Sequence, residues 1–409
     1  MDLTELTGAI LAYGEICDHC LGRMVGKRSF GLTNDQRGRA LRISYYLARN
    51  EPYRPHEDTC WICLDFFDGT GEWADRVAAA LEGIECATFL IGTRIPPLMA
   101  ESEEMVWSDL SLTHAEPLKS EINREVGKAV AERTGKEADL LRPDVVVILD
   151  PVSGTIEVQV SAVFFSGRYR KLERGIPQTH WDCRACRGKG CERCGFTGKQ
   201  YADSVEELIG RPVVEMFDAE GAVLHGAGRE DIDARMIGTG RPFVMEVVAP
   251  RRRTVDLRSV EQDVNTRAAG RVEVALTGWS RREDVETIKS DKAHKKYRIL
   301  VEIDGPLSFS ELESALEALK GVTIEQRTPQ RVVHRRADKV RERKVLEIEA
   351  VGSEDTRFVI EVTGEAGLYI KELISGDSGR TRPSLAGVLG KPARVTQLDV
   401  LQVRGSAEE

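Results

Sequence analysis

The sequence predicts an α+β protein with more than one domain. Its 409 residues are too many for a single ordinary hydrophobic core, and 41% of them are hydrophobic, which is ample for folding. Segments with helical spacing of apolar residues and segments with strand-like alternation follow one another along the chain. The second half lacks the regular succession of strand and helix that is typical of a parallel sheet. It is therefore expected to form a mixed, mainly antiparallel sheet with packed helices.

Four segments follow one another along the chain. Residues 1–65 hold the first cysteine pairs, 66–177 alternate strands and helices, 178–200 form a connector rich in cysteine and glycine, and 201–409 form the remainder. We expect the first two segments to form one N-terminal domain, 1–177. The N-terminus is acidic where a signal peptide would be basic, and its apolar stretch is too short to span a bilayer, which indicates a cytoplasmic protein without a membrane segment.

The second segment predicts one helix followed by two strands. Residues 118–135 carry apolar residues at the spacing of an amphipathic helix. Residues 143–150 begin after a proline-marked boundary and are rich in β-branched side chains, and 155–167 alternate before a glycine, so each is expected to be a strand. The basic segment 168–174 comes directly after the second of these strands.

The last segment predicts strands at 298–304, 343–351 and 357–364. A helix between the first two strands has Ser308 and Glu311 in the positions of a capping box, and Gly321 is expected to end it.

Eight of the nine cysteines fall into four Cys-x-x-Cys pairs, which is typical of metal binding rather than of disulfides. Two pairs are separated by a long stretch, and the other two share one short glycine-rich loop. The two sets are Cys17, Cys20, Cys60 and Cys63, and Cys183, Cys186, Cys191 and Cys194. Four thiolates favour a closed, structural zinc site, and the spacing is not that of a bacterial ferredoxin. The sequence leaves open whether ligands pair within or across the sets.

The charge is unevenly distributed. The net charge of -9 argues against a nucleic-acid partner, yet residues 326–344 carry eight basic residues against two acidic ones. Further basic clusters occur at 168–174, 251–253 and 291–298. These clusters predict RNA binding, and the alternative for any one of them is a solvated charged surface.

Residues 226–243 place Asp231 and Asp233 among arginines and glycines. A carboxylate held ionised by guanidinium groups can act as a nucleophile or base. On a strand, both aspartates would share a face with Arg229 and Arg235. The alternative is a network of surface salt bridges.

Two other motifs indicate different chemistry but lack the residues it needs. Gly69, Gly71 and Ala74 fit a dinucleotide-binding pattern, but the next strand does not end in the acidic residue that would bind a ribose. The Gly-Asp-Ser-Gly sequence at 376–379 resembles a serine-protease loop without a histidine and aspartate organised around it. We interpret both as turns and expect no nucleotide cofactor.

The sequence from Gly228 to Asp231 resembles the Gly-Arg-x-Asp catalytic loop of pseudouridine synthases. The segments 293–298, 328–344 and 367–390 are similar, in that order, to the catalytic domain of the archaeal tRNA pseudouridine synthase ten family. The cysteine knuckles, the connector and the basic strand before 178 resemble the N-terminal half of its archaeal members, in which a THUMP RNA-binding module would occupy about 66–177. The resemblance covers nearly the whole chain.

The resemblance implies a tRNA pseudouridine synthase with an N-terminal α/β, THUMP-containing domain and a catalytic domain at 201–409. It implies isomerisation of uridine to pseudouridine at positions 54 and 55 in the T arm of tRNA, without an organic cofactor. Asp231 would be the catalytic carboxylate, with Lys371 or Arg380 as the cation that keeps it ionised. The remaining site residues that it implies are Tyr297, stacked on the base, Arg229, at the vacated place of the flipped nucleotide or on a phosphate, and Ile370 and Leu398, walling the pocket.

Two other functions fit the same sequence features. A non-catalytic tRNA-binding or folding module would keep the metal sites and the basic clusters. A different RNA-modifying enzyme, such as a thiolase, would need a reactive cysteine, and only Cys86 lies outside the paired sets, in an apolar run where it is expected to be buried. The choice between a pseudouridine synthase and a non-catalytic tRNA-binding module depends on Asp231.

Overall fold

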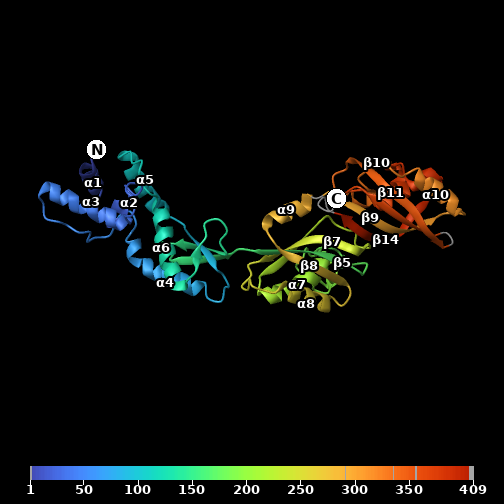
Figure 1. Cartoon of the computed structure of the whole chain (residues 1–409), viewed down its shortest axis with the longest axis horizontal. Coiled ribbons are helices and arrows are strands. Elements are labelled where there is room, and N and C mark those ends of the chain that lie inside the picture. The colour runs from blue at the N-terminus through green and yellow to red at the C-terminus, as the bar shows by residue number, and fades with distance from the viewer. Residues whose placement is uncertain (1, 291, 335, 355–356, 405–409) are drawn as a thin grey trace. The chain divides into compact units, whose positions relative to one another are not determined.

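The computed structural model describes residues 2–290, 292–334, 336–354 and 357–404, and it divides into two compact units, 1–161 and 162–409 (Figure 1). The boundary therefore lies at Ser161 rather than at 177, where the sequence analysis placed it. Among the described residues, no helix combines the length and apolar character needed to cross a membrane.

The first unit combines helices with a small sheet of order β2-β1-β3-β4. Strand β1 is parallel to β2 and β3, and β4 is antiparallel to β3. Helices α4 and α6 contact each other and this sheet (Figure 1). The elements are α1 Leu3–Leu11, α2 Asp18–Arg23, α3 Asn34–Arg49, α4 Thr70–Ala80, β1 Thr88–Thr93, α5 Pro97–Asp109, α6 Leu118–Thr134, β2 Glu137–Ala138, β3 Val145–Asp150 and β4 Thr155–Val160.

Two predicted elements of this unit are confirmed. Helix α6 buries Ile122, Val126 and Val130. It ends at Thr134, and Gly135, which follows, adopts a left-handed conformation. Strand β3 alternates fully and partly buried residues, as the β-branched run predicted. The predicted glycine-containing turn between a strand and a helix is not formed. Gly69 ends a short 3-10 helix, Phe66–Gly69, and Gly71 and Ala74 lie in helix α4.

The second unit is built on one large sheet that is mainly antiparallel, as predicted. In the part described, its ten strands run in the order β13-β10-β11-β12-β9-β14-β7-β5-β8, with β6 on β7, and β14 pairs in parallel with β7. The strands are β5 Val163–Lys171, β6 Gly221–Gly226, β7 Arg235–Val248, β8 Val272–Ser280, β9 His294–Ile303, β10 Thr323–Arg327, β11 Val340–Glu354, β12 Arg357–Gly364, β13 Thr381–Arg382 and β14 Ala393–Arg404.

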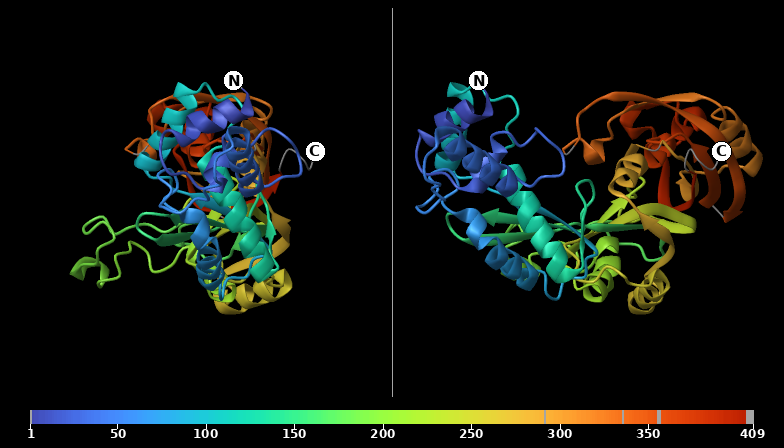
Figure 2. Two further views of the ribbon diagram at one scale, coloured as in Figure 1. Left: turned by 90° about the vertical axis from the view of Figure 1, so that its left-hand side faces the viewer. Right: turned by 60° about the vertical axis from the view of Figure 1, so that its left-hand side comes forward.

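Helices cover this sheet in two groups. Helices α7 and α8 pack against the β5, β7 and β8 portion, and α10, α11 and α12 lie at the β10–β14 portion (Figures 1 and 2). The helices are α7 Val205–Phe217, α8 Leu257–Ala268, α9 Arg282–Ser290, α10 Phe309–Glu317, α11 Ile370–Ser375 and α12 Leu385–Leu389. The capping box of Ser308 and Glu311 starts α10 as predicted, but the helix ends at Glu317, four residues before Gly321.

The run 155–167 is not the single strand that its alternation predicted. It breaks at Ser161, whose backbone N–H donates to Asp144 O and whose hydroxyl donates to Pro143 O. Strand β4 thus stays in the first unit, whereas β5 pairs with β7 and β8 of the second. The basic strand that the sequence analysis assigned to the N-terminal RNA-binding module is therefore part of the sheet whose β6–β7 loop carries the Gly-Arg-x-Asp motif. Alternation could not reveal this, because it does not specify the partner strand.

Candidate active site

The loop between β6 and β7 carries Asp231. Asp231 and Asp233 lie in a turn, so the predicted strand with a shared face of aspartates and arginines is wrong. Arg235 instead makes a two-pronged ion pair with Asp399 of β14, with N···O distances of 2.9 and 2.6 Å. Gly228 opens the loop with φ of +78°, a conformation that L side chains rarely adopt. A Cβ atom there would also lie 3.3 Å from the Arg241 guanidinium.

A buried ion pair holds the loop from beneath. The side chains of Glu230 and Arg241 are each 1% exposed and lie 2.8 Å apart. The Tyr169 hydroxyl donates to the Glu230 carboxylate at 2.8 Å, and Gln178 Nε2 donates to Gly228 O at 3.0 Å. Because both charges are removed from water, each depends on the other for compensation.

Lys171 fixes the backbone of the same loop. Its buried ammonium group donates to the carbonyl oxygens of Ile176, Asp231 and Ile232 at 2.8, 3.2 and 3.1 Å. Burial lowers the pKa of Lys171. Lys171 belongs to the basic segment 168–174, so at least this charge serves the loop rather than RNA.

Two cations contact the Asp231 carboxylate. Arg331 Nη1 donates to Asp231 Oδ1 at 3.0 Å, and Lys371 Nζ lies 3.6 Å from Oδ2. Burial opposes the charge on Arg331, but hydrogen bonds from its guanidinium to Glu372 and Asp231 raise its pKa. The Asp231 side chain is 31% exposed, so it is open to an incoming ligand.

Asp233 lies on the other side of Lys371. Lys371 Nζ donates to both of its carboxylate oxygens, at 2.9 and 2.6 Å. Although partial burial works against it, this hydrogen bond lowers the pKa of Asp233. The Asp233 side chain is 67% exposed, and the guanidinium of Arg331 is directed at Asp231 instead, which distinguishes the two aspartates.

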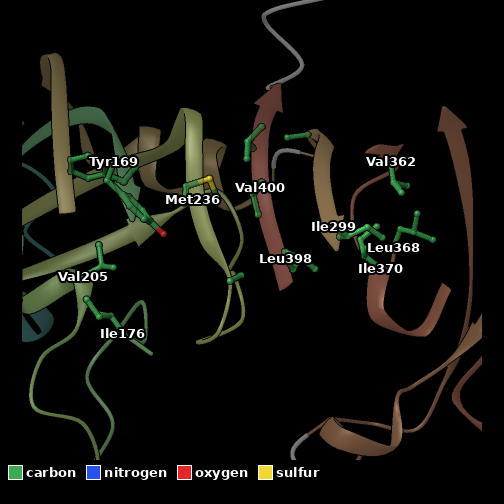
Figure 3. Close-up of a cluster of buried hydrophobic side chains, with 14 of the residues drawn as sticks. Tyr169, Ile176, Val205, Met236, Ile299, Val362, Leu368, Ile370, Leu398 and Val400 are labelled. Carbon is green, nitrogen blue, oxygen red and sulfur yellow. The ribbon is translucent and has the colours of Figure 1, made fainter. Parts of the chain in front are cut away.

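A cavity of about 220 Å³ opens over Asp231. Tyr297 of β9, Ile370 of α11 and Leu398 of β14 line it, and Figure 3 shows Ile370 beside Leu368 and Ile299. The cationic side chains that line it are Arg229, Arg241, Lys295, Arg331, Arg336, Arg341, Arg343 and Lys371. Such a cationic lining suits a polyanionic ligand.

Arg380 does not take the position that the sequence analysis gave it. It pairs with Asp338 at 2.8 Å and donates to Thr328 O at 2.7 Å. In the described part of the chain it lines neither cavity at Asp231. Of the two candidate cations, only Lys371 is at the carboxylate, and Arg331 takes the other place.

Sequence reasoning missed Arg331, Lys171 and the Glu230–Arg241 pair. Arg331 is one of eight basic residues in the segment 326–344, and nothing in the sequence distinguishes it from the other seven. Glu230 occupies the variable position between the arginine and the aspartate of the Gly-Arg-x-Asp motif. An acidic residue at such a position is typical of a surface charge. Nothing in the sequence distinguished Lys171, because Arg168, Arg170 and Arg174 lie in the same basic segment.

The cysteines gather within their sets and not across them. The sulfur atoms of Cys17, Cys20, Cys60 and Cys63 lie within 4.8 Å of one another, and so do those of Cys183, Cys186, Cys191 and Cys194. Individual sulfur–sulfur distances are 3.6 Å for Cys17–Cys63, and 4.0, 3.9 and 3.7 Å for three pairs of the second set. Four thiolates bound tetrahedrally at about 2.3 Å from zinc lie about 3.8 Å apart, so both sets fit a metal ion.

The comparisons with known proteins place the chain in the class of pseudouridine synthases. A family model described as "Pus10, C-terminal" matches residues 164–404, and one described as "Pus10 THUMP domain, archaeal" matches 73–150. Proteins named tRNA pseudouridine synthase Pus10 are 47% identical in Methanothrix thermoacetophila, over 99% of this chain and 95% of that one, and 48% identical in Halorubrum lacusprofundi, over 100% and 98%. The chain belongs to the Pus10 family, and it is an enzyme of the pseudouridine synthase class.

Solved structures resemble this chain only weakly. One of a Cbf5-Nop10-Gar1 complex is 18% identical and covers 49% of this chain and 45% of its own, with a TM-score of 0.32.

Proposed function

We propose that the protein isomerises uridine to pseudouridine in the T arm of tRNA, at positions 54 and 55, with Asp231 as the catalytic carboxylate. The observation that carries this proposal is the position of the Asp231 carboxylate, in a cationic cavity and in contact with Arg331 and Lys371. The names of the relatives support tRNA as the substrate. Incubation with an unmodified tRNA transcript, followed by carbodiimide mapping of pseudouridine, tests activity and position together.

The reaction breaks the bond between uracil N1 and the ribose anomeric carbon and joins that carbon to uracil C5. The proton leaves C5, and N1 ends protonated, so there is no net oxidation. Asp231 has two possible roles, adding to the anomeric carbon or removing the neighbouring ribose proton. Both are roles of the carboxylate group, to which Arg331 donates a charge-assisted hydrogen bond.

Tyr297 is proposed to stack on the target base in its neutral form. Burial raises the pKa of Tyr297 to about 12, so its hydroxyl keeps its proton throughout the physiological range. A neutral phenol provides a flat apolar face and a hydrogen-bond donor.

Replacing Tyr297 with phenylalanine is expected to leave the alkaline side of the pH–rate profile unchanged up to about pH 10, because the raised pKa keeps the wild-type hydroxyl neutral there. Single-turnover rates between pH 6 and 10 measure this. An alkaline decline near pH 9 that disappears in Tyr297→Phe would show an ionising tyrosine. Tyr297→Ala, which removes the stacking face, is the contrasting variant.

The basic segment 326–344 is proposed to lie along the tRNA backbone. Arg336, Arg341 and Arg343 line the cavity at Asp231, while Arg327 is paired with Asp338. Arg335 lies outside the described residues. Phosphate contacts of this kind position the substrate without reading its sequence.

Charge reversal by Arg336→Glu together with Lys339→Glu is expected to weaken binding of all tRNAs alike. The slope of log affinity against log salt concentration should become shallower by about 0.7–0.9 for each phosphate that the segment no longer binds. Equilibrium binding at several salt concentrations measures both effects. The matched control is Arg394→Glu on β14, whose arginine is paired with Glu302 outside the cavity. Unchanged affinity in the double variant would remove the segment from the RNA interface.

Both cysteine sets are proposed to hold structural zinc. Their thiolates fit a reducing, cytoplasmic setting, and a four-cysteine site leaves no position open for catalysis.

Metal analysis is expected to find two zinc ions per chain. Cys194→Ser should lower this to one and Cys86→Ala should leave two, because Cys86 belongs to neither set. Iron with visible absorbance would contradict the assignment.

A further inference from the structure

The cysteine-rich connector touches the catalytic loop through Arg229. Arg229 Nη2 donates to Thr179 Oγ1 at 3.0 Å, and its guanidinium carbon lies 5.4 Å from the centre of the Trp181 ring. Arg229 is two residues before Asp231 in the same loop. The connector thus contributes an aromatic ring beneath a flat cation beside the proposed catalytic carboxylate.

Contacts between the two ends of the connector fix the position of Trp181. The backbone N–H of Gln200 donates to Trp181 O at 2.9 Å, and Asp182 and Lys199 form a β-bridge at the base of the loop. Tyr201 packs edge-on against the indole, with ring centres 5.7 Å apart. Beyond this base the connector extends outward as a loop (Figure 2), and it is there that the second cysteine set lies.

A second cavity, of about 360 Å³, lies against this pair. Trp181 and Arg229 line it together with three further cationic side chains, Arg331, Arg336 and Lys371. Asp231 lines both this cavity and the one that contains Tyr297. A ligand whose reacting sugar is at Asp231 and whose base is at Tyr297 therefore has room for an adjoining group in the second cavity.

We propose that the Arg229–Trp181 pair is a binding platform for the base of the nucleotide next to the target uridine. Guanidinium planes and aromatic rings bind unpaired bases by stacking, whichever base is present. Arg336 and Lys371 are placed to bind the phosphate that joins the two nucleotides. This inference rests on the proposed function, because it takes the target to be a uridine in RNA, and it adds a site that neither Asp231 nor Tyr297 provides.

The first experiment needs no protein variant. Unmodified tRNA transcripts carrying one abasic nucleotide, either directly 5′ or directly 3′ of the target uridine, are titrated against the full chain. One of the two positions is expected to weaken binding on the order of tenfold, because a stacked base contributes about 1–3 kcal/mol. Equal affinity for both abasic transcripts and the intact one would overturn the proposal.

The second experiment removes the platform. Trp181→Ala is expected to bind the intact transcript as weakly as the wild type binds the abasic one. The variant should also bind the intact and the abasic transcript with equal affinity. Additive losses would overturn the proposal, since they would mean that the base and the indole act separately. Trp181→Phe keeps a ring and should restore most of the affinity. Trp279→Ala, which removes a 51% exposed tryptophan outside both cavities, is the matched control.

A kinetic measurement separates positioning from a general structural loss. Trp181→Ala is expected to raise KM with little change in kcat, whereas a misplaced Asp231 would lower kcat. The binding experiments do not depend on turnover, so failure of the proposed function, with no pseudouridine formed, is distinguishable from failure of the platform. Abasic sensitivity in a protein that formed no pseudouridine would preserve the platform and refute the activity.

Discussion

Asp231→Asn is expected to lower the rate of pseudouridine formation by at least about 10³-fold, a loss typical of removing a group that acts on the reacting atoms. Asparagine keeps the shape of the side chain but can neither add to the anomeric carbon nor remove a proton from the ribose. Affinity for tRNA should stay within about threefold, because most of the binding energy comes from phosphate contacts. Single-turnover modification and equilibrium binding on the same preparation measure the two effects.

Asp233→Asn is the matched control for this variant. Asp233 lies in the same turn and contacts the same Lys371, but it is largely exposed, and Arg331 donates to Asp231 instead. It should retain most of the activity. Full modification by Asp231→Asn would refute the catalytic assignment and leave a tRNA-binding module, whereas loss of activity in Asp233→Asn alone would move the assignment by two residues.

Glu230→Gln is expected to lower the free energy of unfolding of the second unit by about 3–5 kcal/mol, the usual cost of leaving a buried partner charge uncompensated. The Arg241 guanidinium is 1% exposed, so it has no access to water when its carboxylate is lost. The melting temperature should fall on the order of 10 °C for a unit of this size. Activity should fall as well, because Glu230 precedes Asp231 in the loop.

A variant that removes both charges tests the reason for this loss. Glu230→Leu combined with Arg241→Met leaves no buried charge, and it should be more stable than either single replacement. Denaturant unfolding of Glu230→Leu, Arg241→Met and the double variant measures the coupling between the two residues. A Glu230→Gln protein as stable as the wild type would show that the pair does not support the loop.

The elements that the sequence predicted correctly depend on contacts within a few residues. Helix α6 follows from apolar spacing over four turns, and the start of α10 follows from a capping box formed by Ser308 and Glu311. The end of α10 was less predictable, because the chain leaves the helix at Glu317 before reaching its glycine. The prediction of a single strand at 155–167 was wrong for a different reason. An alternating pattern is the same whether the residues form one strand or two strands in different sheets.

The candidate site divides in the same way. The motif at 228–231 indicated Asp231 before Asp233, and the hydrogen bond from Arg331 to Asp231 is consistent with that order. The cation was harder to choose. Lys371 and Arg380 are close in sequence, but only Lys371 reaches the loop, because Arg380 is engaged by Asp338.

The sequence by itself determined the chemistry of the groups: the eight cysteines in pairs, the aspartate that follows Gly-Arg, the basic segment, and the local helices and strands. Only the tertiary structure decided which of these groups meet. Arg331 and Asp231 are 100 residues apart, and Lys171 is 60 residues from Asp231, whose carbonyl oxygen is one of the three to which it donates. The reason is physical: propensities and spacing act between near neighbours, whereas the partner of a charge is fixed by how the strands are ordered in the sheet.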